Sequence, residues 1–255
     1  MPHLPDPSAA FRDDCDDCDL LVVGGGVNGA GIARDAAGRG LRVVLCEKDD
    51  LASHTSSAAT KLIHGGLRYL EHYEFSLVRK ALAEREVLLR NAPHIIRPLR
   101  FVMPRDPSMR PGWMIRIGLF LYDHLSRREV LPGSTAIRLD RHPAGEPLQP
   151  RFEQGFVYSD GWVDDARLVV LNARDAADRG PTVLTGTFCE HARRGATHWQ
   201  ATLRGPDGQR RELRARALVN AAGPWAASFL QQQAGQVGRR GLRLIKGSHI
   251  VVPRL

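Results

Sequence analysis

"DLLVVGGGVNGAGIARDAAGRGLRVVLCEK", residues 19–48, is the stretch that decides the fold. It opens with an apolar run, Leu20 to Val23, that is typical of a buried parallel strand, and a glycine turn follows at once. A helix rich in small residues then extends to Gly40, and a second strand, residues 41–46, ends at Glu47. Strand, turn, helix, strand and acid in this order predict a Rossmann-like nucleotide-binding unit, hence an α/β fold with a parallel sheet.

The glycines of the turn and the acidic residue after the second strand each have a physical role in binding a dinucleotide. Gly24, Gly26 and Gly29 match G-x-G-x-x-G, in which the glycines allow a tight turn, close approach to a pyrophosphate and close helix–strand packing. Asn28 lies in the same turn and is a further cofactor-binding candidate. Glu47 follows the turn by about 20 residues, where a carboxylate can accept both ribose hydroxyls of an adenosine. This spacing favours a dinucleotide without a 2′-phosphate.

Composition limits the class of protein. The 255 residues are 43% hydrophobic and 25% charged, as expected for a soluble globular chain. The formal net charge is +8, but the basic residues are nearly all Arg and are scattered, which disfavours nucleic-acid binding. Residues 1–18 contain no apolar run of the signal-peptide kind, so we expect a short disordered tail and a cytosolic origin.

The cysteines do not predict a metal site or a reactive thiol. Cys15 and Cys18 form a CxxC among aspartates, without further ligands nearby, and we interpret them as reduced surface thiols. Cys46 lies in an apolar strand and is expected in the core.

A second stretch with unusual chemistry is "TSSAATKLIHGGLRYLEHYEF", residues 55–75. Its hydroxyls and the free N–H groups of a helix start could bind a second phosphate, and its Gly-Gly pair could let the backbone approach a flat group, as in a bound flavin. In the alternative interpretation the hydroxyls cap a helix and His64 is a hydrogen-bonded polar residue. The cofactor-binding candidates in this stretch are Thr55, Ser56, Ser57, Lys61, His64, Gly65 and Gly66.

The remaining chain predicts a second, interleaved domain with an antiparallel sheet. Residues 76–91 read as an amphipathic helix, and 97–111 as a strand-and-turn region. Residues 111–125 form a helix too short to span a bilayer. It is either an interfacial anchor carrying Trp113 or a helix buried beneath the substrate domain.

The chain then returns to the nucleotide-binding domain. A helix is expected from Asp164, and strands at 182–189, 198–203 and 212–220, the last two joined by a turn at "GPDG". The string "ALVNAAGPWA" repeats the pattern of a buried strand followed by small residues. It predicts that Ala221, Ala222 and Gly223 lie against the dinucleotide.

Several long strings resemble the FAD-dependent glycerol-3-phosphate dehydrogenases of the aerobic, respiratory type. They are "VVGGGVNGAGIARDAAGRGL", "TKLIHGGLRYLEHYEFSLV", "ALAEREVLL", "GWMIRIGLFLYDHL", "YSDGWVDDARLV", "LVNAAGPWA" and "RLIKGSHIVVPR". The resemblance implies bound FAD, oxidation of sn-glycerol 3-phosphate to dihydroxyacetone phosphate, and transfer of electrons to membrane quinone. It also implies a peripheral position on the cytoplasmic face of the inner membrane, and leaves a homodimer open.

Such proteins are about twice as long, so the resemblance implies an N-terminal portion with an incomplete substrate domain. The expected segments are a tail (1–18), the FAD-binding domain (19–92 and 161–238), the substrate or cap domain (93–160) and the start of its truncated continuation (239–255).

The resemblance also implies roles for individual residues. Arg68 and Tyr69 lie where the family contacts the substrate, and Lys246 is a further substrate-binding candidate. His249 and His64 compete for the role of base, because histidine titrates near neutral pH. We favour His249 as the base and expect His64 to contact the flavin. We interpret the other three histidines considered as structural, namely His72, His94 and His124.

Two other functions stay open at this point. The chain could bind FAD or another adenine nucleotide without turnover, or it could be an amine or hydroxy-acid oxidase of the same fold. The sequence does not distinguish quinone from oxygen as the electron acceptor.

Overall fold

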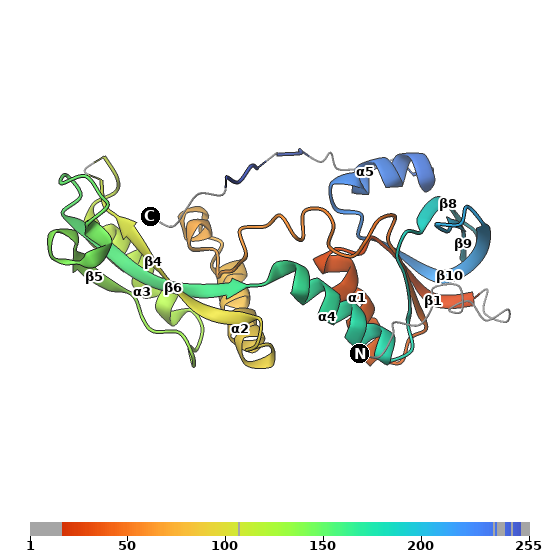
Figure 1. Ribbon diagram of the computed structural model, residues 1–255, viewed down its shortest axis with the longest axis horizontal. Helices are drawn as coiled ribbons and strands as arrows, with labels where there is room; N and C mark the ends of the chain where they lie inside the picture. Colours follow the sequence, from red (N-terminus) through yellow and green to blue (C-terminus); the bar gives the residue numbers. More distant parts are fainter. Residues whose placement is uncertain (1–16, 107, 237, 239–242, 246, 251–255) are drawn as a thin grey trace. The chain divides into compact units, whose positions relative to one another are not determined.

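The computed structural model describes residues 17–106, 108–236, 238, 243–245 and 247–250 (Figure 1). The chain divides into two compact units. Among these residues, the first unit contains 17–59 and the described part of 165–249, and the second contains the described part of 60–164 together with Ile250. Each unit has its own sheet.

The first unit is built on a six-stranded sheet in the order β7-β2-β1-β10-β9-β8. The bounds are β1 Asp17–Val23, β2 Val43–Cys46, β7 Thr182–Leu184, β8 Phe188–Arg194, β9 Trp199–Arg204 and β10 Arg210–Asn220. Strands β7, β2, β1 and β10 are parallel, whereas β9 and β8 continue the sheet antiparallel. Val23 pairs with Cys46 on one side and Asn220 on the other, so three strands end together at one edge.

Helices α1 (Val27–Gly38) and α4 (Asp165–Asp178) pack side by side against this sheet (Figure 1). The contact is made by small residues, since Ala30 lies in one cluster with Val169 and Ala173. Small side chains let two helices approach closely. The core cluster on the other face of the sheet contains Phe229. This residue begins η6 (Phe229–Gln233), which follows the short helix α5 (Ala226–Ser228).

The prediction of one continuous strand over residues 182–189 is wrong. Residues 182–189 form β7 and then the start of β8, because the chain leaves β2 on one side of the sheet and joins β9 at its far edge. Gly186, with φ of 61°, makes the turn between them, and its N–H donates to the Asp49 carbonyl at 2.8 Å. The predicted hairpin at "GPDG" is confirmed, with Gly208 N–H donating to the Gly205 carbonyl at 3.0 Å.

The second unit has an antiparallel sheet in the order β3-β6-β4, and β5 also pairs with β6. The strands are β3 Leu62–Ile63, β4 Ile96–Pro104, β5 Thr135–Arg138 and β6 Gln154–Val163. The helical elements are η2 Leu67–His72, α2 Phe75–Asn91, α3 Gly112–His124, η3 Leu139–Arg141 and η4 Pro143–Gly145. Val78, Leu82 and Tyr122 form its buried cluster, which joins α2 to α3. Together with the largely parallel sheet of the first unit, this antiparallel sheet confirms the predicted fold class.

The compact units differ from the predicted segments. The second unit begins at Thr60 and not at residue 93, because β3 pairs with β6 and α2 packs in the same core as α3. It ends at Asp164, whereas the predicted boundary followed residue 160. Strand β1 begins at Asp17, inside the predicted tail. The division into compact units does not show which segments contact a cofactor. The predicted FAD-binding segments therefore stay predictions.

Helix α3 presents a large apolar face. Trp113 is 64%, Ile117 51% and Phe120 53% exposed, while Leu119 and Tyr122 are buried. The interpretation of 111–125 as a buried helix therefore holds for one face only. Among the described residues, no helix has the length and apolar character needed to cross a bilayer.

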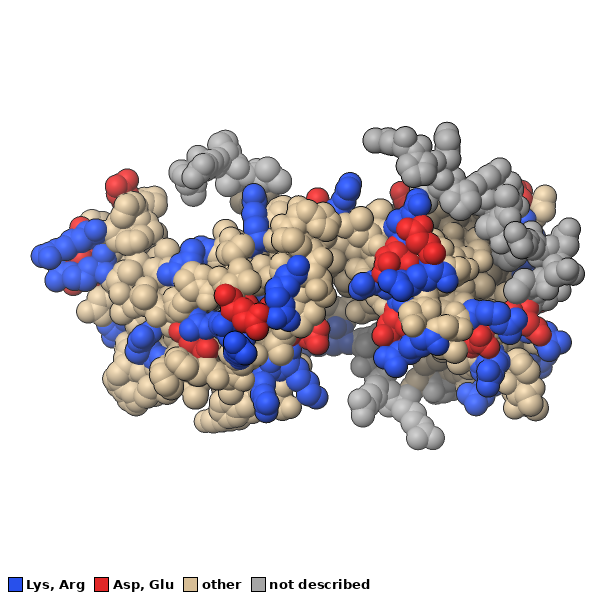
Figure 2. Space-filling model, turned by 90° about the horizontal axis from the view of Figure 1, so that it is seen from below, with Lys and Arg blue, Asp and Glu red and all other residues tan. Residues whose placement is uncertain are grey.

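Most charged side chains on the face drawn in Figure 2 lie interspersed by sign. Local ion pairs of this kind include Arg39 with Asp35 and Arg174 with Asp178, each one helical turn apart. Such exposed pairs contribute little to stability.

The buried cysteines of the first unit give a testable expectation. Cys18, Cys46 and Cys189 are buried, and Cys46 and Cys189 are free thiols. The prediction for Cys46 is confirmed, whereas the prediction of a surface position for Cys18 is wrong, because β1 places it in the core of the sheet. Burial raises the pKa of the Cys189 thiol to about 12, which leaves roughly a thousandfold less thiolate at neutral pH than an ordinary cysteine has. We expect these thiols to resist iodoacetamide in the native protein and to react in denaturant, as measured by mass spectrometry. Rapid native labelling of Cys46 or Cys189 would contradict this packing.

Candidate functional site

A pocket of about 250 Å³ lies in the first unit, where β1, β2 and β10 end. It brings together residues that are far apart in sequence. The predicted cofactor-binding residues that line it are Gly24, Gly26, Glu47, Thr55, Ser56, Ala221, Ala222 and Gly223. The motif and the "NAAG" string thus meet at one site.

The glycine turn that forms this pocket permits contacts that no larger residue allows. Gly24 has φ of 114°, and a Cβ there would overlap the Ala221 carbonyl. A Cβ on Gly29 would overlap the Gly24 carbonyl, so α1 packs directly on the turn. Gly26 precedes α1, and a Cβ there would lie 3.0 Å from Ser56 Oγ. The first and third glycines are therefore required by the fold itself.

Glu47 is tied to the backbone around it. Its Oε2 accepts the Gly25 N–H at 2.6 Å and its Oε1 accepts the Asp49 N–H at 3.0 Å. The residue is 8% exposed and lines the pocket. The carboxylate thus fixes the glycine turn as well as presenting acceptor oxygens to the pocket.

The segment that follows Glu47 differs from the prediction. Residues 51–57 form successive turns and not the start of a helix; the N–H groups of Ser57 and Ala58 donate to the carbonyls of His54 and Thr55. Ser56 Oγ instead accepts the Val27 N–H at 2.9 Å and so caps α1. The helix that these hydroxyls serve is therefore the earlier one, a long-range contact that local sequence does not show.

Several other predicted cofactor residues lie elsewhere. Asn28 is exposed, and Gly29 is buried in the helix–turn contact. Neither Ser57 nor Lys61 lines one of the two pockets; the Lys61 carbonyl accepts the Val163 N–H at 2.9 Å.

An aromatic and charged cluster at this pocket was missed. Lys48 Nζ lies 3.9 Å from the centroid of the Trp225 ring, and the His54 ring meets Trp225 edge-on at 4.6 Å. His54 Nε2 also lies 2.7 Å from Asp49 Oδ2, and this hydrogen bond lowers the pKa of Asp49. All line the pocket except Asp49. The sequence contains a signal for this cluster, because Lys48 directly follows the predicted ribose ligand Glu47 and Trp225 ends the "GPW" string after the predicted cofactor residues.

The second unit contains its own pocket, of about 500 Å³. The predicted residues His64, Gly66, Arg68 and Tyr69 all line it. Its other lining residues are Leu62, Leu67, His72, Phe101, Tyr158 and Asp160. Phe101 on β4 pairs with Tyr158 on β6, and their rings stack at 5.3 Å. His72, which was predicted to be only structural, therefore shares a pocket with the substrate candidates.

The Gly65–Gly66 pair is explained within this unit. Gly65 donates its N–H to the Tyr122 hydroxyl at 2.8 Å, and a Cβ there would meet Leu82. Gly66 has φ of 75°, and a Cβ there would meet the Tyr69 ring. The glycines let the backbone pass close to side chains of its own unit. Their predicted contact with a flavin stays a prediction.

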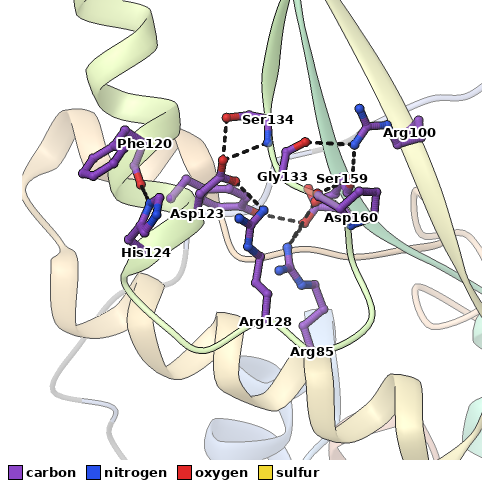
Figure 3. Close-up of polar contacts among 12 residues, drawn as sticks. Arg85, Arg100, Phe120, Asp123, His124, Arg128, Gly133, Ser134, Ser159 and Asp160 are labelled. Carbon is purple, nitrogen blue, oxygen red and sulfur yellow. Dashed lines mark hydrogen bonds and ion pairs between the residues drawn. The ribbon is translucent and has the colours of Figure 1, made fainter.

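A buried polar network reaches the second pocket through Asp160, and Figure 3 shows the contact of Arg85 with that residue. Arg85, 1% exposed, donates to Asp160 Oδ1 at 2.7 Å, and the Tyr122 hydroxyl donates to the same oxygen at 2.7 Å. Burial, then the charge of Asp160, raises the pKa of Tyr122. This network was missed. Its signal is that Arg85 lies on the same helical face as the buried Val78, Leu82 and Leu89.

The remaining described residues considered in the sequence are not among those that line the two pockets. His249 is exposed and lines neither of the two pockets. Lys246 lies outside the described residues. His124, predicted to be structural, lies with Nδ1 2.7 Å from the Phe120 carbonyl.

Comparison with known families gives a match over residues 19–255 to DAO, described as FAD dependent oxidoreductase. The chain belongs to this family. The prediction of FAD as the cofactor is thereby confirmed at the level of the family.

Individual relatives agree with the resemblance found in the sequence. The chain is 62% identical over 237 residues to a glycerol-3-phosphate dehydrogenase from Pseudomonas aeruginosa, covering 93% of this chain and 46% of that protein. It is 57% identical to the aerobic glycerol-3-phosphate dehydrogenase of Escherichia coli and 58% identical to a D-erythritol 1-phosphate dehydrogenase of Brucella abortus. Both matches cover 93% of this chain and 47% of the relative, so the chain spans about half the length of these proteins.

A solved structure supports the fold. The Bacillus halodurans glycerol-3-phosphate dehydrogenase complexed with FAD is similar with a TM-score of 0.63 and 27% identity, over 85% of this chain and 36% of that one.

The first pocket fits the dinucleotide part of FAD. Gly24 and Gly26 line it beside the start of α1, where first-turn N–H groups lack intrahelical acceptors and can bind a phosphate. Glu47 supplies carboxylate oxygens and Trp225 an aromatic ring in the same wall. Glu47, Asp49 and His54 also place potential metal-binding atoms within 4.8 Å of one another, but the hydrogen bonds described above account for that arrangement.

Replacing Glu47 by Gln tests both roles of this residue. Gln keeps the shape but must turn its NH₂ group toward either the Gly25 or the Asp49 N–H donor. We expect FAD affinity to fall about tenfold to a hundredfold, the factor for one lost hydrogen bond to a charged group, with a lower Tm. Flavin-fluorescence titration of apoprotein measures the affinity. Glu84→Gln, at an exposed position on α2, is the matched control. Unchanged affinity with unchanged Tm would contradict both roles.

Proposed function

We propose that the chain serves an FAD-dependent dehydrogenase that oxidises sn-glycerol 3-phosphate to dihydroxyacetone phosphate and passes the electrons to membrane quinone. The observation that carries the proposal is the second pocket, which gathers His64, Arg68 and Tyr69. These residues come from the strings that resemble glycerol-3-phosphate dehydrogenases, and 57–62% identity to such enzymes supports the same assignment.

Arg68 is the group proposed to bind the substrate phosphate. No described residue forms a hydrogen bond or ion pair with its guanidinium, and the nearby Glu71 lies 3.9 Å from Arg110 instead. A guanidinium that lines a pocket and has no partner within the described ranges is available for bidentate binding of a phosphate. The Tyr69 hydroxyl is proposed to donate a hydrogen bond to the same group.

Oxidation of the secondary alcohol requires removal of a hydride from the carbinol carbon and of a proton from its hydroxyl. Bound flavin supplies the hydride acceptor. A histidine removes the proton, and the predicted candidates are His249 and His64. Arg68 fixes the phosphate so that only the carbinol end of the substrate is mobile, which converts binding into orientation.

The first pocket is proposed to hold the dinucleotide. Glu47 would accept hydrogen bonds from the ribose hydroxyls, and the glycine turn with the N–H groups of the first turn of α1 would bind the pyrophosphate. Thr55 and the Ala221–Gly223 segment would line the remaining wall.

A second candidate substrate is favoured by one comparison. The Brucella abortus relative is described as a D-erythritol 1-phosphate dehydrogenase at 58% identity, so a longer phosphorylated polyol is the competing substrate. The chemistry at Arg68 is common to both. The alternative of an amine or hydroxy-acid oxidase rests on the fold alone.

Arg68→Lys tests the phosphate assignment in the FAD-loaded protein. Lysine keeps the charge but loses the two-pronged geometry. We expect kcat/KM for sn-glycerol 3-phosphate to fall about tenfold to a hundredfold, mainly through KM, with little change for glycerol and in bound flavin.

The wild-type reference is anaerobic bleaching of the flavin absorption by sn-glycerol 3-phosphate, with D-erythritol 1-phosphate as competitor. No bleaching by either compound would leave a protein that binds nucleotide without this turnover. Equal losses for phosphorylated and unphosphorylated alcohols in the variant would overturn the role of Arg68.

We also propose peripheral attachment to the cytoplasmic face of the inner membrane, where quinone is reached. Its support is the exposed face of α3, formed by Trp113, Ile117 and Phe120, with the exposed Arg110 nearby in sequence. Aromatic and aliphatic groups flanked by arginine suit the boundary between headgroups and acyl chains.

Ile117→Glu tests this attachment. Burial of one such side chain is worth about 1.5–3 kcal/mol, so we expect roughly tenfold to hundredfold weaker partitioning into anionic phospholipid vesicles, measured by co-sedimentation. Leu77→Glu, at a similarly exposed apolar position on α2, is the control and should bind as the wild type does. Equal binding by all three proteins would exclude α3 as the contact.

A further inference from the structure

Tyr122 makes the only hydroxyl contact to the backbone of the Gly65–Gly66 turn among the described residues. Its hydroxyl accepts the Gly65 N–H at 2.8 Å and donates to Asp160 Oδ1 at 2.7 Å. An amide can only donate and a carboxylate accepts, so the direction of both bonds is fixed. The raised pKa of Tyr122 means that its proton stays in place at neutral and moderately alkaline pH.

Asp160 is in turn held rigidly from α2. Arg85 Nη1 donates to Asp160 Oδ1 at 2.7 Å and to the Ser159 carbonyl at 3.2 Å. Arg85 also pairs with Glu86, whose Oε2 accepts the N–H groups of Glu129 and Val130 at 3.1 Å each. Figure 3 shows the contact between Arg85 and Asp160. Because Arg85, Glu86 and Asp160 are buried and bonded to separate elements, Asp160, which accepts from Tyr122, has little freedom to move.

The turn held by Tyr122 leads directly into the substrate candidates. Before it, Leu62 and Ile63 pair with β6; after it, the Tyr69 N–H donates to the Gly66 carbonyl at 2.8 Å and starts η2. Arg68 lies between these fixed points and has no partner of its own among the described residues. The position of its guanidinium therefore depends on the backbone of the turn.

We propose that Tyr122 is a positioning residue for phosphate recognition, which fixes the Gly65–Gly66 turn and through it places Arg68 in the second pocket. The inference rests on the proposed function and extends it from the residue that binds the phosphate to the buried group that sets its geometry. Arg85 and Asp160 act one step further away, by holding the Tyr122 hydroxyl.

A double-mutant cycle tests the proposal. Tyr122→Phe is made in the wild-type and in the Arg68→Ala background, and dissociation constants of sn-glycerol 3-phosphate and of glycerol are measured by calorimetry on the FAD-loaded protein. In the wild-type background we expect sn-glycerol 3-phosphate to bind about threefold to tenfold more weakly, as for one lost neutral hydrogen bond, with glycerol unchanged. In the Arg68→Ala background we expect no further loss.

A second measurement is independent of ligand. Tyr122→Phe frees the Gly65 N–H, so its hydrogen exchange should accelerate in a variant whose flavin content and far-UV circular dichroism match the wild type. Tyr73→Phe is the matched control, because Tyr73 is 80% exposed and lies just beyond η2. It should change neither the exchange of Gly65 nor the affinity.

The outcomes distinguish a failure of the positioning role of Tyr122 from a failure of the proposed function. Equal losses of affinity in both backgrounds, or an unchanged affinity in the wild-type background, overturn the positioning role of Tyr122. A wild-type protein that binds sn-glycerol 3-phosphate no more tightly than glycerol overturns the proposed function and this inference together.

Discussion

The close backbone approach at Gly24 is the constraint on which the first unit depends. Its N–H donates to the Cys46 carbonyl at 2.8 Å, and the side where a Cβ would project is filled by the Ala221 carbonyl. β1, β2 and β10 are therefore drawn together where they end, and the packing of Gly29 on Gly24 directs α1 away from the same point. The pocket is a consequence of this geometry, because three strand ends and a helix start enclose it.

The second unit depends on a different interaction, the buried pair of Arg85 and Asp160. Burying two charges is costly and often gives little net stability, whereas removing one partner of such a pair costs about 3–5 kcal/mol. The pair joins α2 to β6 at one defined register, and the hydrogen bond that Asp160 accepts from the Tyr122 hydroxyl adds α3. Such a network favours a single arrangement of its elements over a more stable but less specific apolar core.

The two units divide the chemistry proposed for the protein. The first supplies a glycine turn, a carboxylate and an aromatic ring, which suit a dinucleotide. The second supplies an arginine with no partner in the described part of the chain, a tyrosine and a histidine, which suit a small phosphorylated alcohol. Because the two pockets lie in separate units, the residues of one can change without a change in the other.

The sequence by itself determined the strand–turn–helix unit, because glycine spacing and hydrophobic period are local properties. FAD as the cofactor followed from the resemblance of long strings to a known family, and the candidates His64, Arg68 and Tyr69, which rest on the same resemblance, stay predictions. Only the tertiary structure decided that Ser56 caps α1, that residues 182–189 serve two separate strands, and that Gly65 is held by Tyr122. The two hydrogen bonds join residues separated by 29 and 57 positions in the chain, and the division into two strands follows from the order of strands in the sheet. Contacts at such separations are chosen by packing and by the satisfaction of buried polar groups, which no local pattern encodes.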